Sequence, residues 1–213
     1  MELVRSSMVV DAGAATFEAA LREALDRGER ASLALSGGSS PWPVLEALAS
    51  SDLPWDRIDV FQVDERVAPD GDDARNLTGL RRVLIDHVPA TLHPMPVTED
   101  DLTAAAAAYA ARLPATIDVV HLGLGDDGHT ASLVPADPVL DVVDRTVAVT
   151  EPYRGHRRMT LTYPALHRAG RIIWYVAGAG KEHMLSRLVA TDPEIPAGRV
   201  AADRATVVTD LVL

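Results

Sequence analysis

Residues 117–133, IDVVHLGLGDDGHTASL, join an apolar run directly to a loop that is rich in glycine and aspartate. The run from Ile117 to Leu122 predicts a buried strand. Ligands of open parallel α/β sheets bind just beyond the carboxyl ends of the strands. The loop leads to His129, and histidine is the side chain best suited to move a proton near neutral pH. A lone histidine in a loop is most often a solvated turn residue, so its interpretation depends on the rest of the chain.

Strands and helices alternate along the remaining sequence. Apolar runs predict strands over 31–35, 58–63, 146–149, 158–162, 172–177 and 205–208, and helices are predicted over 14–28, 43–49, 77–87, 101–112, 164–168 and 181–190. This alternation predicts an α/β fold with a mostly parallel sheet and helices on both faces. No repeat or linker divides the chain, so we expect residues 1–213 to form a single domain, with 191–199 as an internal loop.

Composition excludes several classes of protein. The chain has 20 Lys and Arg against 31 Asp and Glu, a formal net charge of −11, so we expect no nucleic-acid partner. It has no cysteine, which excludes disulfides and thiol nucleophiles and fits a reducing compartment. Neither a signal peptide nor a membrane-spanning run is present in the sequence, so we expect a cytoplasmic protein without a membrane partner.

A second loop, residues 36–40 with the sequence SGGSS, lies between a predicted strand and a predicted helix. Two glycines permit close backbone approach, and the start of the helix offers free N–H groups and a partial positive charge. This arrangement suits a phosphate or another anion, although an ordinary turn with a serine cap has the same composition. The loop lacks the spacing of the dinucleotide and Walker motifs.

Charged residues follow other predicted strands. Residues 64–66, Asp-Glu-Arg, come directly after the strand that ends at Val63. Arg66 is suited to hold an anion or an oxyanion, and the acidic pair is suited to orient it or a histidine. Lys181 begins a predicted helix, where a cation is disfavoured unless an anion lies nearby. Arg158 begins a strand and is either a surface charge or a ligand contact.

A metal site is not expected. His121 and His129 do not have helical ligand spacing, and residues 126–128, Asp-Asp-Gly, lack the longer pattern of a calcium loop.

Together these loops resemble the α/β type of 6-phosphogluconolactonase. The shared segments occur in the family's order over about the whole chain: residues 36–41, 64–66 with Asn76 downstream, 123–133, 158–162 and 178–181. The resemblance implies the fold of the glucosamine-6-phosphate deaminase/isomerase and ribose-5-phosphate isomerase group. It also implies hydrolysis of a small-molecule sugar-phosphate lactone, 6-phospho-D-glucono-1,5-lactone, to 6-phospho-D-gluconate in the pentose phosphate pathway, without a cofactor. Members of the family are often monomeric, which implies a monomer here, with a homodimer as the alternative.

Three positions depart from the family's pattern. Ser40 replaces the usual Thr and keeps its hydroxyl, and Val134 replaces a common Phe. Arg75 replaces a Ser before Asn76, and the sequence leaves open whether this arginine adds a cation near the ligand.

The resemblance also implies roles for individual residues. His129 is the expected general base, and its neutral form starts the reaction, so activity should fall as acid protonates it. Either Asp127 or Asp64 orients the imidazole, and the sequence does not choose between them. The expected catalytic residues are His129, Arg66, Asp127 and Asp64, and the expected substrate- and phosphate-binding residues are Ser36, Gly37, Gly38, Ser39, Asn76, Gly125, Arg158 and Lys181.

Two alternatives remain. Glucosamine-6-phosphate deaminase/isomerases resemble the chain at the glycine-rich and Asp-Gly-His loops, but they typically have Asp-Glu-Tyr and Ala-Phe-Asn-Glu-Pro where residues 64–66 and 131–135 read Asp-Glu-Arg and Ala-Ser-Leu-Val-Pro. The carboxylate expected shortly after the histidine is therefore absent. The second alternative is a non-catalytic sugar-phosphate sensor, which usually carries a DNA-binding helix-turn-helix domain, for which this chain has no basic segment.

Overall fold

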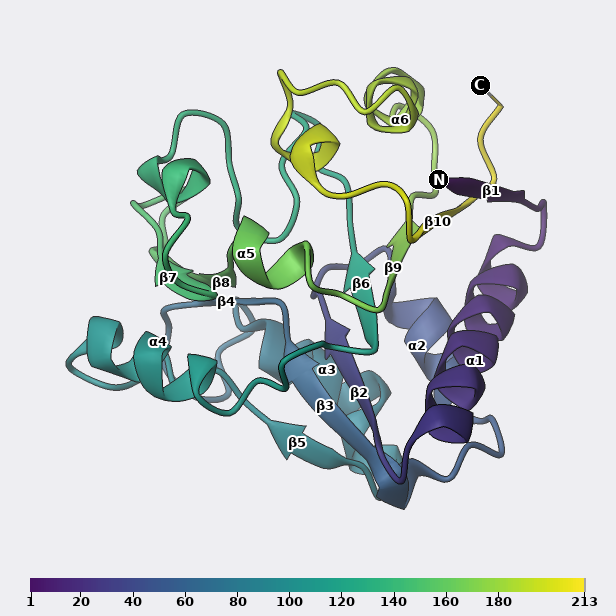
Figure 1. The fold of residues 1–213 in the computed structure, drawn as a ribbon, viewed down its shortest axis with the longest axis horizontal. Helices are drawn as coiled ribbons and strands as arrows, with labels where there is room; N and C mark the ends of the chain where they lie inside the picture. The colour runs from purple at the N-terminus through teal and green to yellow at the C-terminus, as the bar shows by residue number, and fades with distance from the viewer. Residues whose placement is uncertain (213) are drawn as a thin grey trace.

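The computed structural model describes residues 1–212 and contains a seven-stranded sheet (Figure 1). Its order is β1-β10-β9-β6-β2-β3-β5, and every neighbouring pair is parallel, which confirms the expected α/β fold. The strands are β1 (Glu2–Arg5), β2 (Ala31–Leu35), β3 (Ile58–Gln62), β5 (Thr91–His93), β6 (Val119–Leu122), β9 (Arg171–Tyr175) and β10 (Ala205–Thr209).

Helices cover both faces of this sheet, as expected. One face packs against α1 (Val9–Arg27), α2 (Trp42–Ala49) and α3 (Asn76–Val83). The other packs against α4 (Leu102–Ala110), α5 (Tyr163–Leu166) and α6 (Glu182–Val189), and Figure 1 shows α1 and α4 on opposite sides of the strands. Short 3-10 helices occur at Trp55–Arg57, Ile85–His87, Pro138–Asp141 and Pro196–Arg199. The predicted helix 77–87 is therefore an α-helix followed by a separate 3-10 turn.

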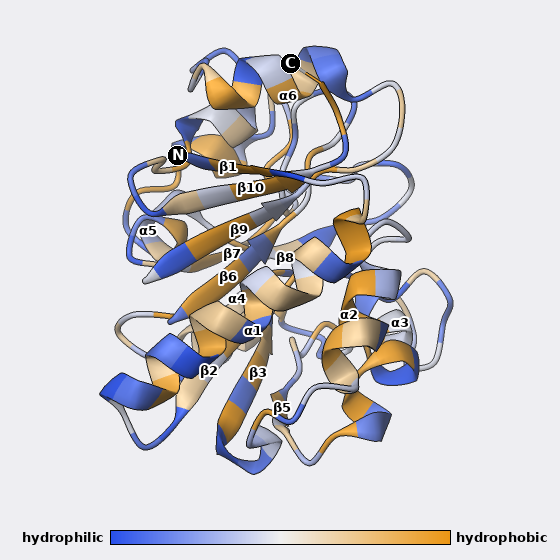
Figure 2. Ribbon diagram, turned by 90° about the vertical axis from the view of Figure 1, so that its right-hand side faces the viewer, coloured by the Kyte–Doolittle hydropathy of each residue, from blue (hydrophilic) through white to orange (hydrophobic). Residues whose placement is uncertain are grey.

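Burial on both faces explains why the central strands are apolar without interruption. In β6, Val119 packs in the core beneath α1, whereas Val120 packs in the opposite core. Figure 2 shows apolar residues concentrated along the same central strands. Buried polar residues occur at both ends of the strands, with Ser32 near the start of β2 and Gln62 at the end of β3. No helix among residues 1–212 has the length and apolar character needed to cross a bilayer.

A second, three-stranded antiparallel sheet lies beside the first, and the sequence analysis did not predict it. It has the order β4-β8-β7 and comprises β4 (Asp64–Arg66), β7 (Val147–Val149) and β8 (Arg158–Leu161). The sequence analysis placed residues 64–66 after a strand and not in one, because their pairing partner β8 lies far away in the sequence. The backbone N–H of Leu161 also donates to the carbonyl of Val63 at 2.8 Å, which joins this sheet to the end of β3.

Candidate active site

A cavity of about 250 Å³ lies where the loops after β2, β6 and β9 meet the second sheet. Its position at the carboxyl ends of the parallel strands is the usual place for a ligand in an open α/β sheet. The expected site residues gather here: Ser36, Gly37, Gly38, Ser39, Asp64, Arg66, Asn76, Gly125, His129, Arg158 and Lys181 line the cavity. Asp127 does not line it but contacts His129. The structure therefore brings together residues that are up to 145 positions apart in the sequence, from Ser36 to Lys181.

His129 is held by Asp127. The Nδ1 atom of the imidazole lies 2.5 Å from Oδ1 of Asp127, and the same oxygen accepts the backbone N–H of His129 at 3.1 Å. Burial would raise the pKa of Asp127, but the hydrogen bonds from His129 and from Tyr153 outweigh burial and lower that pKa to about 2. Because a carboxylate is an acceptor, Nδ1 carries the proton and Nε2 is left as the basic nitrogen of the neutral ring.

Asp64 is buried among other partners. Its Oδ2 accepts the hydroxyl of Ser132 at 2.6 Å, and its Oδ1 accepts the side-chain amide of Asn76 at 3.2 Å. Burial raises the pKa of Asp64, against the hydrogen bond from Ser132 and the charges of Arg158 and Arg66. The sequence left open which of the two carboxylates contacts the imidazole of His129. In the structure Asp127 is hydrogen-bonded to the imidazole, whereas Asp64 is hydrogen-bonded to Ser132.

Glu65 is completely buried and ties β4 to the start of α3. It accepts the backbone N–H groups of Asn76 at 2.7 Å and Leu77 at 2.9 Å, which are otherwise unpaired at a helix N-terminus. Nε of Arg75 lies 3.1 Å from the same carboxylate. A strand of charged residues is stable at this place because each buried charge has a partner.

Arg75 does not add a cation to the cavity. Its Nη1 donates to the carbonyl of Ala68 at 3.0 Å and to Oδ1 of Asp70 at 2.9 Å, away from the residues that line the cavity. The possibility that Arg75 lies near the ligand is therefore wrong. Arg66 lies in the cavity instead, where its Nη1 donates to the carbonyl of Ala74 at 2.8 Å and to Oδ1 of Asn76 at 3.1 Å.

The SGGSS loop approaches Asn76 closely. A β-carbon at Gly37 would lie 2.1 Å from Oδ1 of Asn76, and Gly38 has a φ of +116°, so both positions require glycine. The hydroxyl of Ser36 donates to the backbone carbonyl of His121 at 3.0 Å and so fixes the loop to β6. Lys181 also lines the cavity, and its Nζ donates to the carbonyl of Leu124 at 2.8 Å.

Arg158 is buried, with 5% of its surface exposed, and lines the cavity from β8. Burial lowers its pKa, against the charge of Asp64. Its guanidinium lies 5.1 Å from the ring centre of Tyr153, and its Nε has no hydrogen-bond partner in the described structure. Its Nη1 donates to the hydroxyl of Ser132 at the long distance of 3.5 Å, which leaves most of its donors for a ligand.

Three side chains of the cavity wall lie outside the loop segments that the sequence analysis singled out. Arg154 comes from a turn without a recognisable motif, and Tyr175 comes from the end of β9. His121 has 1% of its surface exposed, its ring nitrogens are unpaired in the described structure, and its ring lies edge-on to Phe17 at 5.5 Å. Burial lowers the pKa of His121 to about 4, so it is neutral at pH 7. Its place in an apolar strand pattern gave no sign of the cavity.

Metal ligands are not grouped in this site. Within residues 1–212, no three His, Asp or Glu side chains lie close enough together to hold a metal ion. The charges at the cavity are instead the guanidinium groups of Arg66, Arg154 and Arg158, the ammonium group of Lys181 and the carboxylates of Asp64 and Asp126.

Comparison with known proteins agrees with these motifs. The family described as glucosamine-6-phosphate isomerases/6-phosphogluconolactonase matches residues 5–209. A 6-phosphogluconolactonase of Synechocystis sp. is 36% identical over 207 residues, which cover 90% of this chain and 85% of that protein. One of Nostoc sp. is 40% identical over 184 residues, covering 80% of this chain and 76% of that protein.

A solved structure gives the same result for the fold. The crystal structure of 6-phosphogluconolactonase from Thermotoga maritima matches with a TM-score of 0.88 at 27% identity, covering 97% of this chain and 96% of that one. The sequence match and the fold extend over nearly all of the chain, and the chain belongs to the glucosamine-6-phosphate isomerase/6-phosphogluconolactonase family.

Proposed function

We propose that this protein hydrolyses 6-phospho-D-glucono-1,5-lactone to 6-phospho-D-gluconate in the pentose phosphate pathway, with His129 as the general base. The observation that carries the proposal is the pairing of His129 Nδ1 with Asp127 at 2.5 Å in the cavity that the SGGSS loop and four cationic side chains also line. An oriented neutral imidazole beside an anion-binding loop suits a phosphorylated ester. The names of the relatives support the same reaction.

The reaction begins when Nε2 of His129 accepts a proton from water and the resulting hydroxide adds to the lactone carbonyl carbon. The guanidinium of Arg66 stabilises the tetrahedral oxyanion. Arg66 lines the cavity and is held there by its hydrogen bond to Asn76. As the bond between the carbonyl carbon and the ring oxygen breaks, the imidazolium returns its proton to the leaving oxygen. The product is an open-chain carboxylic acid, which ionises, and His129 is neutral again. Asp127 keeps the ring orientated and stabilises its charged form between the two steps.

The phosphate is the second group of the substrate that the cavity has to bind. Backbone N–H groups of Gly37, Gly38 and Ser39 and the ammonium group of Lys181 are its expected donors. The hydroxyl of Ser36 already donates to the carbonyl of His121, so Ser36 acts by fixing the loop rather than by donating this proton to phosphate. Arg158 supplies further buried donors to the cavity. These cations attract an anion locally against the chain's net charge of −11.

The deaminase alternative lacks a residue for its chemistry. Residues 131–135 contain no carboxylate after His129, and residue 66 is an arginine rather than the tyrosine typical of deaminases. A sensor would bind 6-phosphogluconate without turnover.

The test supplies the lactone from glucose 6-phosphate with glucose-6-phosphate dehydrogenase and follows its loss against a buffer control, which corrects for spontaneous hydrolysis. We expect loss faster than in buffer by orders of magnitude and no ammonia from glucosamine 6-phosphate. Loss at the buffer rate, or ammonia release, would contradict the proposed function.

A further inference from the structure

Tyr153 occupies a tight turn beside His129. The N–H of Tyr153 donates to the carbonyl of His156 at 2.9 Å and the N–H of His156 donates back at 3.3 Å, which closes a turn of two residues. Both turn residues have positive φ, Arg154 at 50° and Gly155 at 87°. This backbone matches a type I′ turn, and an arginine in that conformation carries a local conformational cost. The cost is consistent with a turn whose side chains have a function.

The hydroxyl of Tyr153 contacts the carboxylate that holds His129. It donates to Oδ2 of Asp127 at 2.8 Å, while Oδ1 of Asp127 accepts from the imidazole. The rings of Tyr153 and His129 lie edge-to-face, with centroids 5.7 Å apart. The carboxylate is therefore fixed from both sides, and one side of the imidazole has an aromatic neighbour.

The ring of Tyr153 also contacts two cations. The guanidinium carbon atoms of Arg154 and Arg158 each lie 5.1 Å from the centre of the ring, within the range of cation–π attraction. Both arginines line the cavity. A single side chain thus joins the histidine–aspartate pair to two of the cations that face the ligand.

We infer that Tyr153 is a positioning residue with two separable actions, an inference that rests on the proposed function. Its hydroxyl orients Asp127 and through it the basic Nε2 of His129. Its ring holds Arg154 and Arg158 toward the substrate anion. Loss of the hydroxyl should therefore change turnover, whereas loss of the ring should also weaken substrate binding.

Tyr153→Phe removes the hydroxyl and keeps the ring. We expect kcat to fall about 3- to 10-fold, the effect of one ordinary hydrogen bond, with KM within about twofold of wild type. The acid limb of kcat/KM should move to higher pH by about half a unit, because Asp127, released from Tyr153, stabilises the protonated imidazole more strongly. The other charged groups in the cavity, Asp64, Arg66, Asp126, Arg154, Arg158 and Lys181, are unchanged in this variant.

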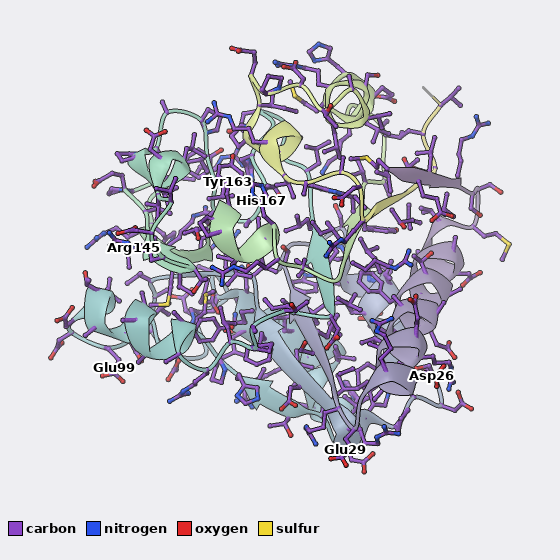
Figure 3. The ribbon with its side chains drawn as sticks, viewed as in Figure 1. Asp26, Glu29, Glu99, Arg145, Tyr163 and His167 are labelled. Atoms are coloured by element: carbon purple, nitrogen blue, oxygen red, sulfur yellow. The ribbon has the colours of Figure 1, made fainter. Side chains whose placement is uncertain are left out.

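Tyr163→Phe is the matched control. Tyr163 lies on α5, where Figure 3 labels it beside His167, and its hydroxyl donates to the carbonyl of Pro196 at 2.9 Å rather than to a group of the cavity. This control should keep the wild-type kcat and pH profile. Tyr153→Leu removes the ring as well, and its KM should rise about tenfold above that of Tyr153→Phe.

A readout without substrate separates this inference from the proposed function. The proton NMR titration of the seven histidines, with His129→Ala to assign the signal of His129, follows the imidazole directly. An upward shift of its midpoint in Tyr153→Phe, and not in Tyr163→Phe, supports the positioning role even for a protein without lactonase activity. An unchanged titration and an unchanged pH profile in Tyr153→Phe would overturn the inference, whatever the wild-type activity is.

Discussion

Gly125 lies so close to His129 that a β-carbon at position 125 would sit 2.1 Å from Nδ1 of the imidazole. The backbone N–H of Gly125 also donates to the carbonyl of His129 at 2.9 Å, which closes the loop around the ring. The sequence analysis placed Gly125 among the ligand contacts. The geometry gives a second reason for a glycine at position 125. Any side chain there would occupy the space of the imidazole in its hydrogen-bonded position against Asp127.

Gly125→Ala should therefore reduce kcat by about 100-fold, because the ring must move by an ångström or more from its position against Asp127. The measurement is steady-state hydrolysis of the lactone, with Gly28→Ala as the control. Gly28 follows α1, lies outside the cavity, and a β-carbon there would meet its nearest atom at 3.4 Å. Equal rates for the two variants would show that the imidazole does not need this space.

Lys181 is the only lysine of the chain. Lys181→Met should raise KM by about tenfold with little change in kcat, since a cation that binds the phosphate in the ground state and in the transition state acts on binding alone. Reductive methylation followed by mass spectrometry gives an independent check. We expect 6-phosphogluconate to protect Lys181, and equal methylation with and without that product would place the phosphate elsewhere.

His121 should make the fold sensitive to mild acid. It stays neutral in the folded protein because burial lowers its pKa to about 4, whereas the unfolded chain takes up a proton near pH 6.5. Its contribution to stability is thus complete above pH 6.5 and is lost as the pH falls toward 4. In urea unfolding, wild type should lose about 2 kcal/mol more than His121→Leu between pH 7 and pH 5. Parallel losses in the two proteins would mean that the imidazole is hydrated or paired in solution.

Arg75→Met should destabilise the fold because it leaves the buried carboxylate of Glu65 without its cation. Removing one partner of a buried ion pair costs about 3–5 kcal/mol in the free energy of unfolding. Urea unfolding at pH 7 measures the loss, with Arg145→Met as a control. Arg145, labelled in Figure 3, forms an exposed ion pair with its neighbour Asp144. A loss below about 1 kcal/mol would show that the N–H groups around Glu65 are sufficient partners.

The central parallel strands could be predicted because burial on both faces makes them continuous apolar runs. β1 and β5 were missed, since both are short edge strands with exposed or half-buried residues. β4 was missed for a different reason. Its sequence is entirely charged, and its stability comes from a partner strand at Arg158–Leu161 and from the buried contacts of Glu65. None of these contacts is local in the sequence.

The candidate site was predictable where a residue type alone suggests its chemistry, as for His129, Lys181 and the glycines of the SGGSS loop. The sequence could not show whether Asp127 or Asp64 orients the imidazole of His129. The decision depends on the partner of Asp64, Ser132, which is distant in the sequence and close only in the fold. Tyr153 and Arg154 were not found because a two-residue turn has no functional signature. Arg75 was misplaced because a sequence does not show on which side of a helix start a long side chain extends.

The central claim is that His129 is the base of a lactone hydrolysis. The most direct measurement compares wild type with His129→Ala for kcat on freshly generated lactone and, by calorimetry, for the affinity of 6-phosphogluconate. We predict a loss of at least about 100-fold in kcat, the contribution of a general base, with product affinity within a few-fold of wild type. A variant that keeps the wild-type kcat while it binds the product would contradict the account.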